Sequence, residues 1–319
     1  MKNEMKPELN NYTDQNTAMK KHVLSITRMT SHNGPGFRTL VLFKGCPLRC
    51  VWCSTPESQE LGFETAVFPK KCTNCGYCVP ICPQRAITLT ENGVSINREV
   101  CNNCGECAKV CYPEAIKNIS QWMSVEEILE EVEKDRIIYK HSGGGVNFSG
   151  GEPLLLQPDF NRELFSACKN GGINVAVTTS GHVPWTNIEQ VLPYVDFFLW
   201  DIKHMDPQKH QEYTGVSNKL ILSNLRLVSM KGIPLYIRIP VIPGYNDSIA
   251  NISATCKFVQ SLRSVVTVDL LPVHHLGRAR YESIDRPYLI DKVDLISDEV
   301  MLDLKRLVES FGLECRIGG

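Results

Sequence analysis

Three cysteines within eight residues form the first group in this chain whose types and spacing suggest a chemistry. Cys46, Cys50 and Cys53 lie in the stretch FKGCPLRCVWCSTPES (43–58) with the spacing C-x3-C-x2-C, and no fourth cysteine is nearby. Three thiolates can hold three irons of a [4Fe–4S] cube, which leaves the fourth iron without a protein ligand. An open coordination position is how a metal site admits a substrate.

The alternative is a cube whose fourth ligand comes from elsewhere in the chain. Three cysteines stand alone in the sequence and are candidates for that role: Cys168, Cys256 and Cys315. None of them lies in a motif-like loop, and a free cysteine outside a motif usually behaves as a small buried apolar residue. We therefore expect all three to lie in the core.

Eight further cysteines occur in two runs, CTNCGYCVPICP and CNNCGECAKVCYP, which share the spacing C-x2-C-x2-C-x3-C. This is the spacing of bacterial ferredoxins with two clusters, in which the fourth cysteine of each run binds the other cube. The predicted ligands of one cluster are therefore Cys72, Cys75, Cys78 and Cys111, and those of the other are Cys82, Cys101, Cys104 and Cys107. Tyr112 delays the proline of the second run by one residue, which should leave the ligand in place. Zinc is the alternative, but its sites use two C-x-x-C pairs separated by a longer gap.

The composition of the whole chain is that of a globular protein. It has 319 residues, of which 43% are apolar and 22% charged. The net charge is -1, and lysines and arginines are spread along the chain, which argues against binding to nucleic acid or an acidic membrane. No apolar run approaches the length of a membrane span, and the polar N-terminus lacks the apolar core of a secretory signal. Fourteen cysteines in such a chain favour metal binding and a reducing, cytoplasmic setting.

Strand and helix patterns alternate around the cysteine-rich segment. We expect a flexible tail over 1–20, a first part of the main domain over 21–68, an insert over 69–118 and the remainder over 119–319. Apolar strands are predicted at 39–43, 145–151, 173–181, 195–203, 234–244 and 265–273. Helices are predicted after the Ser124–Glu127 capping box, around Phe160–Cys168, and over 217–231, 248–262 and 297–311. Such alternation implies a parallel sheet, either a partial barrel or a doubly wound sheet.

The residues with possible chemistry follow the strands at one edge of this predicted sheet. The Cys46 group, residues 149–152, residues 179–181, residues 201–203 and His274 each come directly after a strand. In parallel sheets the carboxyl ends of the strands carry the active site. Asp201 and Lys203 are two residues apart, so their side chains should point to the same face.

The order of these motifs resembles that of a known family. HNGPGFRTLVLFKGCPLRCVWCSTPES, the cysteine-rich insert, SGGEP, DIK, YIRIPVIPGYND and LLPVHHLG are similar to the glycyl radical enzyme activating enzymes, in the subgroup with two additional clusters. These are radical S-adenosylmethionine (SAM) enzymes. The resemblance covers residues 23 to about 280 and implies an α/β fold, a partial (β/α)6 TIM-like barrel with an inserted ferredoxin-like domain.

The resemblance also implies an activity and a set of cofactors. Three [4Fe–4S] clusters and SAM are expected, with SAM bound to the open iron and split on reduction to a 5′-deoxyadenosyl radical. That radical removes a hydrogen from a backbone glycine of a partner lyase, dehydratase or decarboxylase. Flavodoxin or ferredoxin is the expected electron donor. Oxygen-sensitive clusters agree with an anaerobic cytoplasm.

Matching motifs assign roles to individual residues. The three cluster cysteines and Lys203 are implied in catalysis. The implied SAM-binding residues are Trp52, Gly150, Gly151, Glu152, Thr179, Asp201, Lys203, Arg238 and His274. The sequence departs from the family at Asn33, Thr55 and Thr178, where aspartate, asparagine and an acidic residue are common. The last departure puts in doubt a monovalent cation site that some relatives have.

Two other hypotheses use part of the same residues. A radical SAM enzyme acting on a small molecule would have the same site. A ferredoxin-like electron carrier would account for the insert but would leave the loops of Glu152, Asp201 and His274 without a role.

Overall fold

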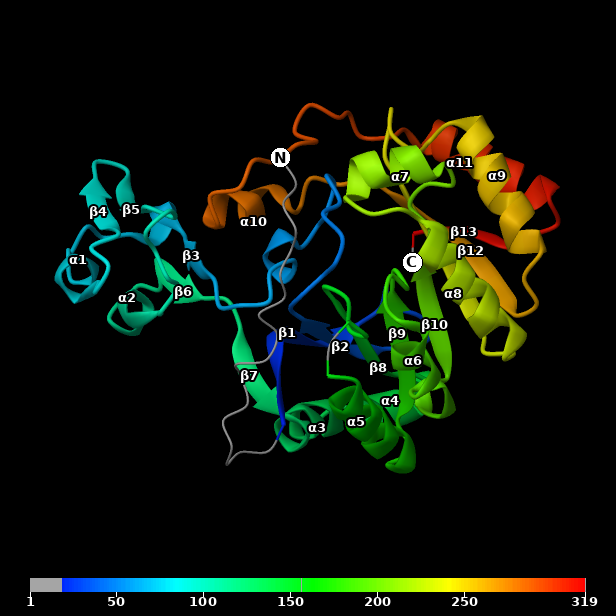
Figure 1. Ribbon diagram of the computed structural model, residues 1–319, viewed down its shortest axis with the longest axis horizontal. Coiled ribbons are helices and arrows are strands. Elements are labelled where there is room, and N and C mark those ends of the chain that lie inside the picture. The colour runs from blue at the N-terminus through cyan, green and yellow to red at the C-terminus, as the bar shows by residue number, and fades with distance from the viewer. Residues whose placement is uncertain (1–18, 156, 319) are drawn as a thin grey trace.

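A largely parallel sheet of nine strands forms the body of the protein, as the computed structural model shows for residues 19–155 and 157–318 (Figure 1). Its order is β13-β12-β11-β10-β9-β8-β2-β1-β7. Seven strands are parallel: β2 (Arg38–Phe43), β8 (Gly145–Gly150), β9 (Asn174–Thr179), β10 (Phe197–Asp201), β11 (Leu235–Val241), β12 (Val265–Pro272) and β13 (Cys315–Ile317). β1 (Lys20–Thr30) is antiparallel to both β2 and β7 (Gln121–Ser124).

The strand order favours a barrel-like sheet over a doubly wound one. From β8 to β13 each strand lies beside the next one along the chain, whereas a doubly wound sheet reverses its order at a switch point. Edge strands β13 and β7 do not pair with each other in the described part of the chain, so the sheet is open. The predicted α/β class with a parallel sheet is confirmed, and the arrangement is consistent with a partial barrel.

Helices cover one face of the sheet. They are α3 (Val125–Glu133), α4 (Arg136–Ser142), α5 (Pro158–Asn170), α6 (Trp185–Glu189), α8 (Lys219–Met230), α9 (Ile249–Gln260) and α11 (Asp298–Ser310). Alternate strand residues such as Phe148, Val177 and Trp200 join the helices in the main apolar core. α5 supplies Phe160, Leu164, Phe165 and Cys168 to this core.

The opposite face of the sheet is apolar at one end and polar near the carboxyl ends of the strands. Ala176, Phe197, Leu199 and Tyr236 form a small cluster at the first end, where the Arg38 guanidinium lies 4.6 Å from the ring centroid of Phe197. Because side chains alternate between the two faces, later residues of these strands place Thr178, Asp201 and Arg238 on the same face. Asn147 and Asp269 lie beside them on the neighbouring strands β8 and β12.

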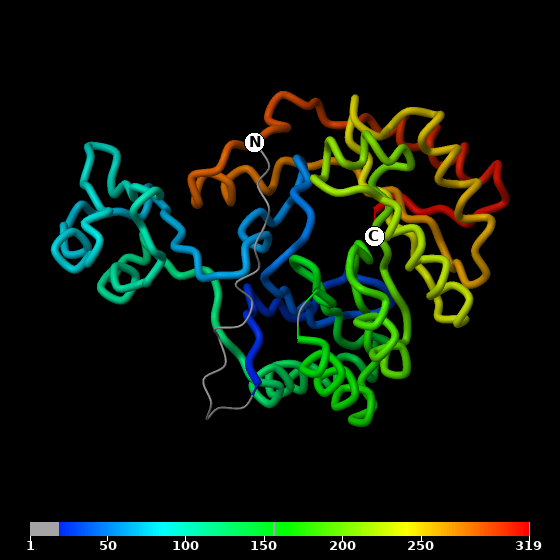
Figure 2. The backbone as a smooth tube through the Cα atoms, in the orientation of Figure 1, coloured from blue at the N-terminus to red at the C-terminus, as the bar shows by residue number. Residues whose placement is uncertain are grey.

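The cysteine-rich segment forms a small separate body that projects from one side of the sheet (Figure 2). β3 (Thr65–Val67) pairs with β6 (Ile116–Asn118), and β4 (Ile87–Thr90) pairs with β5 (Gly93–Ile96). Two short helices, α1 (Cys78–Ile81) and α2 (Glu106–Lys109), complete it around a small apolar cluster. β3 is the first strand of this body, so the body begins at Thr65, four residues before residue 69, where the insert is predicted to begin.

Local signals that the sequence carries are confirmed. Ser124 accepts a bond from the Glu127 amide, and the Glu127 carboxylate accepts one from the Ser124 amide, which completes the predicted capping box. Ser248 and Ser297 cap α9 and α11 through their side chains alone, which accept hydrogen bonds from the amides of Asn251 and Val300. The predicted tail lies largely outside the described residues, although Lys20 already belongs to β1. No described helix is long and apolar enough to cross a membrane.

Candidate active site

The cysteine loop begins directly after β2 and is fastened by backbone hydrogen bonds to two neighbouring segments. Gly45 and Cys46 donate to the carbonyls of Ser58 and Gln59, at 2.8 and 3.0 Å. These acceptors belong to and follow a one-turn 3-10 helix, η1 (Pro56–Ser58). The amides of Arg49 and Val51 donate to residues 214 and 213 at the end of α7 (Pro207–Thr214). These bonds fix the path of the loop backbone relative to η1 and α7.

The glycine pair after β8 packs directly on this loop. The Gly151 amide donates to the Phe43 carbonyl at 2.8 Å, and the Glu152 amide donates to the Gly45 carbonyl at 2.7 Å. A Cβ at Gly150 would lie 2.4 Å from the oxygen of Phe43, and one at Gly151 would lie 2.3 Å from the oxygen of Gly45. Gly150 also has a φ of +104°. Only glycine permits this approach of backbone to backbone.

The Glu152 carboxylate is buried and bonded within the protein. It is 1% exposed and accepts hydrogen bonds from the Thr179 hydroxyl at 2.6 Å, from the amide and hydroxyl of Ser180 and from the Leu154 amide. Burial raises the pKa of Glu152, while these donors oppose the rise. These hydrogen bonds join the loop after β8, through Glu152, to Thr179 and Ser180 at the end of β9.

A buried lysine supports the same loop from behind. The Lys21 ammonium on β1 donates to the Pro153 carbonyl and to the Asn161 side chain, both at 2.6 Å, and lies 4.5 Å from the ring centroid of Phe43. Burial lowers the pKa of Lys21 to about 7, partly offset by the charge of Glu152. No sequence motif includes Lys21, so its role was missed, and a lysine in an otherwise mixed strand gives no signal of burial.

Asp201, Lys203 and Arg238 come together at the ends of β10 and β11. Lys203 donates to Asp201 at 3.1 Å, and both side chains are largely buried, which confirms that they share a face. The Arg238 Nε lies 3.7 Å from the Asp201 Oδ1, within ion-pair range but too far for a hydrogen bond. Both of those atoms are buried without a hydrogen-bond partner. A carboxylate oxygen and a guanidinium nitrogen left open side by side suit a zwitterionic amino acid ligand.

This charged group faces the cysteine loop. The charges of Lys203 and Asp201 both act on the Cys50 thiol, whose pKa burial raises to about 12. Burial acts to lower the pKa of Lys203, but the nearby Asp201 carboxylate raises it overall. Burial also raises the pKa values of Cys46 and Cys53. Because iron binds thiolates, loading this loop must release protons.

Aromatic side chains and two adjacent histidines border the loop. Trp52 is buried against Tyr245 and Tyr213, with ring centroids 5.7 and 6.1 Å away, and its Nε1 has no hydrogen-bond partner. Neither tyrosine was predicted: Tyr213 lies outside the matched motifs, and Tyr245, although within YIRIPVIPGYND, was assigned no role. His274 is exposed, whereas His275 contacts the Tyr288 hydroxyl and the Val293 carbonyl at 2.9 Å each. His275 therefore has a structural role, whereas the His274 side chain is exposed at the surface.

The three cysteines outside the motifs are buried, as expected. Cys168, Cys256 and Cys315 are buried in the main core between the sheet and the helices, whereas the cysteine loop packs in a different cluster with Ile242 and Val273. The hypothesis that one of them is a fourth ligand is therefore wrong. Thr178, which replaces the acidic residue, exchanges hydrogen bonds with Asn147 at 3.0 and 3.1 Å.

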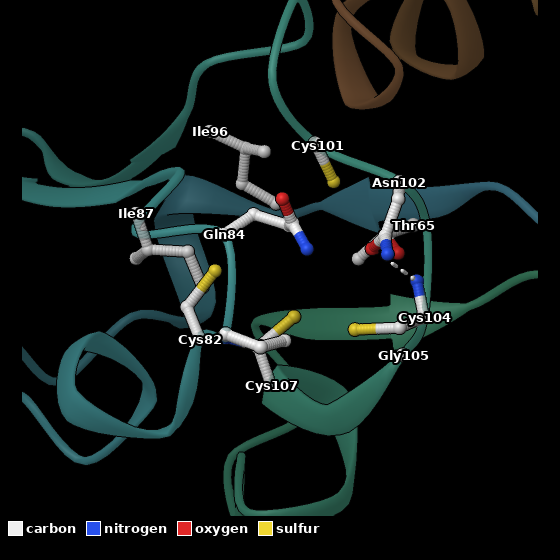
Figure 3. Close-up of a pocket in the computed structure, with 11 residues that line it drawn as sticks. Thr65, Cys82, Gln84, Ile87, Ile96, Cys101, Asn102, Cys104, Gly105 and Cys107 are labelled. Carbon is white, nitrogen blue, oxygen red and sulfur yellow. Dashed lines mark hydrogen bonds between the residues drawn. The ribbon is translucent and has the colours of Figure 1, made fainter.

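The eight cysteines of the insert line two small cavities, four cysteines each. Cys82, Cys101, Cys104 and Cys107 line one of them, with their sulfurs pointing toward a common space (Figure 3). Cys72, Cys75, Cys78 and Cys111 line the other. We call these the inner and the outer cavity. Each holds three cysteines of one run and the fourth of the other, which is the division that the ferredoxin spacing predicts.

Comparison with known proteins first gives the class. The model of the Radical SAM superfamily matches residues 40–254, which is more than half of the chain and spans the cysteine loop, the glycine pair and the β10 and β11 residues.

Curated relatives narrow this class. The chain is 40% identical over 303 residues to the trans-4-hydroxy-L-proline dehydratase activating enzyme of Clostridioides difficile, covering 94% of this chain and 100% of that enzyme. It is 41% identical to the (2S)-3-sulfopropanediol dehydratase activating enzyme of Klebsiella oxytoca, over 93% of this chain and 96% of that enzyme. It is 39% identical to the benzylsuccinate synthase activating enzyme of Thauera aromatica, over 93% and 92%. The chain therefore belongs to the radical SAM activating enzymes of glycyl radical enzymes, as its motif order predicts.

Proposed function

We propose that Cys46, Cys50 and Cys53 hold a [4Fe–4S] cluster with one open iron, and that the surrounding loops hold SAM. The observation that carries this proposal is the pair of open buried atoms, Asp201 Oδ1 and Arg238 Nε, beside the cysteine loop. When bound and reduced, the [4Fe–4S] cluster would supply the electron that splits SAM into methionine and a 5′-deoxyadenosyl radical.

The chain's own residues bind and orient the ligand. The backbone of Gly150 and Gly151 offers a surface that no side chain obstructs, against which a methionine moiety can lie. Arg238 and Lys203 supply positive charge for its carboxylate, and Asp201 supplies negative charge for its amine. Trp52 and its two tyrosine neighbours exclude water from the loop, and His274 is placed to face the adenosine end.

The insert is proposed to carry two further clusters in the inner and outer cavities. Support comes from the ferredoxin spacing, from the two sets of four cysteines and from the small apolar cluster that remains once the cavities are filled. The architecture is then a partial (β/α)6-type barrel with a ferredoxin-like insert, and a small electron donor such as flavodoxin or ferredoxin reduces it. Oxygen sensitivity of such clusters supports an anaerobic, cytoplasmic setting.

The protein substrate is proposed to be a glycyl radical enzyme that acts as a lyase, dehydratase or decarboxylase on a small molecule. The names of the relatives support this range, since they activate dehydratases and a synthase among others. The test is electron paramagnetic resonance of candidate partners incubated with the reduced protein and SAM. A doublet from a backbone glycyl radical in one partner is expected; the absence of a radical in every partner, despite cleavage of SAM, would contradict this part.

Separate cysteine variants test the three-cluster proposal. The reconstituted protein should contain about twelve iron atoms, and replacing Cys46, Cys50 and Cys53 with Ala should lower this to about eight and abolish 5′-deoxyadenosine production. Replacing the outer-cavity cysteines 72, 75, 78 and 111 should also leave about eight iron atoms, but SAM cleavage by dithionite should persist. Iron analysis and chromatography measure both quantities, and an unchanged iron content in either variant would contradict the assignment.

A further inference from the structure

Two exposed apolar side chains line the outer cavity, and two exposed tyrosines are sequence neighbours of its lining residues. Leu89 and Val110 line it and are 41% and 38% exposed, while Tyr77 and Tyr112 are 71% and 98% exposed. Tyr77 follows Gly76, whose Cβ position is 3.5 Å from Leu89, and Tyr112 lies between the lining residues Cys111 and Pro113. We call Tyr77, Leu89, Val110 and Tyr112 the outer patch. Single exposed apolar residues are ordinary, but a group around one cavity with two tyrosines is typical of a contact surface.

Tyr112 is also the residue that breaks the repeat between the two cysteine runs. The first run continues from Cys82 directly to Pro83, whereas the second places Tyr112 between Cys111 and its proline. The extra residue makes no contribution to the apolar cluster of the insert, since it is almost fully exposed. Its side chain is thus available to a partner, and it stands beside a predicted cluster ligand.

The two cavities differ in their relation to the barrel. Thr65 lines the inner cavity, and its carbonyl accepts a bond at 2.6 Å from Arg98, which also contacts Asp285 at 2.7 Å and the Ser283 carbonyl. Those last two residues belong to the barrel side of the junction. α1, which begins at Cys78 of the outer cavity, lies at the far end of the insert (Figure 1). An electron that enters at the outer cavity therefore has the inner one between it and the barrel.

Charge near the outer patch indicates the kind of partner. The insert has six lysines or arginines and four glutamates, whereas the whole chain has a net charge of -1. Lys70 and Lys71 are exposed and directly precede Cys72, the first cysteine of the outer cavity. Of the acidic residues near the outer cavity, Glu114 forms an ion pair with Lys117. Glu91, in the β4–β5 turn, forms no ion pair with the described residues. This balance favours an acidic partner.

We propose that the outer patch is the docking site for a small acidic electron-carrier protein. The inference rests on the proposed function of the insert and adds its point of entry. The carrier's exposed redox group would lie against Tyr77 and Tyr112, next to the group held by Cys72, Cys75, Cys78 and Cys111. One electron leaves the carrier and one is gained by that group, and no bond forms or breaks. The aromatic pair supplies contact area and the two lysines supply attraction to the acidic rim.

The test uses the fully reconstituted protein and reduced flavodoxin as the probe. In the variant Tyr77→Ser/Tyr112→Ser, the dissociation constant for flavodoxin should rise at least tenfold, and flavodoxin-driven cleavage of SAM should fall accordingly. Cleavage driven by dithionite should not change, because the site in the barrel is untouched. A second variant, Lys70→Glu/Lys71→Glu, should weaken binding and reduce its dependence on salt.

The matched control is Ile137→Ser/Ile249→Ser, which removes two side chains that are 74% and 70% exposed on the barrel. It should bind flavodoxin as the unmodified protein does. Unchanged binding in the tyrosine variant would overturn the proposal, as would a variant that binds flavodoxin normally but loses its glycyl radical enzyme partner. If even the unmodified protein bound flavodoxin at the patch but cleaved no SAM with dithionite, docking would stand and the proposed function would fail.

Discussion

At the scale of single residues, the Gly151 backbone packs against the cysteine loop with no room for a side chain. Since a Cβ there would lie 2.3 Å from the Gly45 carbonyl, Gly151→Ala must push the two loops apart. We expect at least a tenfold loss of SAM affinity and of 5′-deoxyadenosine production, with the iron content of the insert unchanged. Gly62→Ala is the matched control, because nothing lies within 4 Å of its Cβ position and its φ is not positive. Equal losses in both variants would contradict this account.

Lys21 gives a prediction about pH. The unfolded chain keeps the Lys21 proton up to a pKa of 10.5, whereas burial in the folded protein lowers that pKa to about 7. Between these values the unfolded state binds more protons, so this lysine makes stability rise with pH, by on the order of 2 kcal/mol from pH 7 to 9. Below pH 7 its burial cost is constant.

The variant Lys21→Met should lose this pH-dependent rise, as followed by urea unfolding without oxygen at pH 7, 8 and 9. Lys20→Met is the control: Lys20 is its neighbour on β1, but it is part-exposed and pairs with Glu127 at 3.5 Å. The same pH slope in Lys21→Met and in the unmodified protein would show that Lys21 is not the group responsible.

Residue chemistry was predictable from spacing where a ligand set is local in sequence. The cysteine runs and the Asp201–Lys203 pair are short motifs, so their grouping follows from the chain itself. The clamp of Glu152 by Thr179 and Ser180, and the burial of Lys21, depend on contacts between distant strands. Periodicity does not encode which buried polar group finds which partner, so these were found only in the structure.

At the scale of elements, strong apolar strands and capped helices were predictable, and weak ones were not. β9, β10 and α5 have a clear apolar periodicity, so the sequence predicts them. β1 was missed because its residues KKHVLSITRMT mix charged and apolar side chains without strict alternation, and α7 because PQKHQEYT buries only His210 and Thr214. Both missed elements hold the site: β1 carries Lys21, and the end of α7 fastens the cysteine loop.

The insert gives a prediction at this scale. Its two sheets have two short strands each, and much of its interior is cavity wall, so its apolar cluster alone should not hold it folded. Removal of iron should raise hydrogen exchange of the β4 and β5 amides more than tenfold, while β9 to β11 exchange as before. Mass spectrometry of the iron-free and reconstituted protein measures this, with the barrel strands as the internal control. Equal protection of β4 in both forms would show that the insert folds without metal.

At the scale of the whole molecule, the segment around α10 (Arg278–Ser283) connects the cysteine loop to the insert. Arg280 forms an ion pair with Glu57 of η1, and Arg286 contacts the Pro56 carbonyl and pairs with Glu64, which also pairs with Lys44. A few residues away, Asp285 contacts the insert through Arg98. Loops far apart in sequence therefore meet at one junction, and no short motif could have predicted it.

Arg98 is the side chain that joins the insert to this junction, and its loss should be felt on the barrel side. Arg98 donates to Asp285, Ser283 and Thr65, so Arg98→Ala removes a three-way contact. We expect hydrogen exchange at residues 283–286 to accelerate about fivefold, because their turn loses an outer partner, while exchange in β9 and β10 does not change. Arg98→Lys keeps the charge but not the forked geometry, so its exchange rate at residues 283–286 should lie between those of the unmodified protein and Arg98→Ala. Lys117→Ala, which removes a surface pair within the insert, should leave residues 283–286 unaffected. Acceleration confined to β5 in the Arg98→Ala protein would mean that the insert is held by its two chain connections alone.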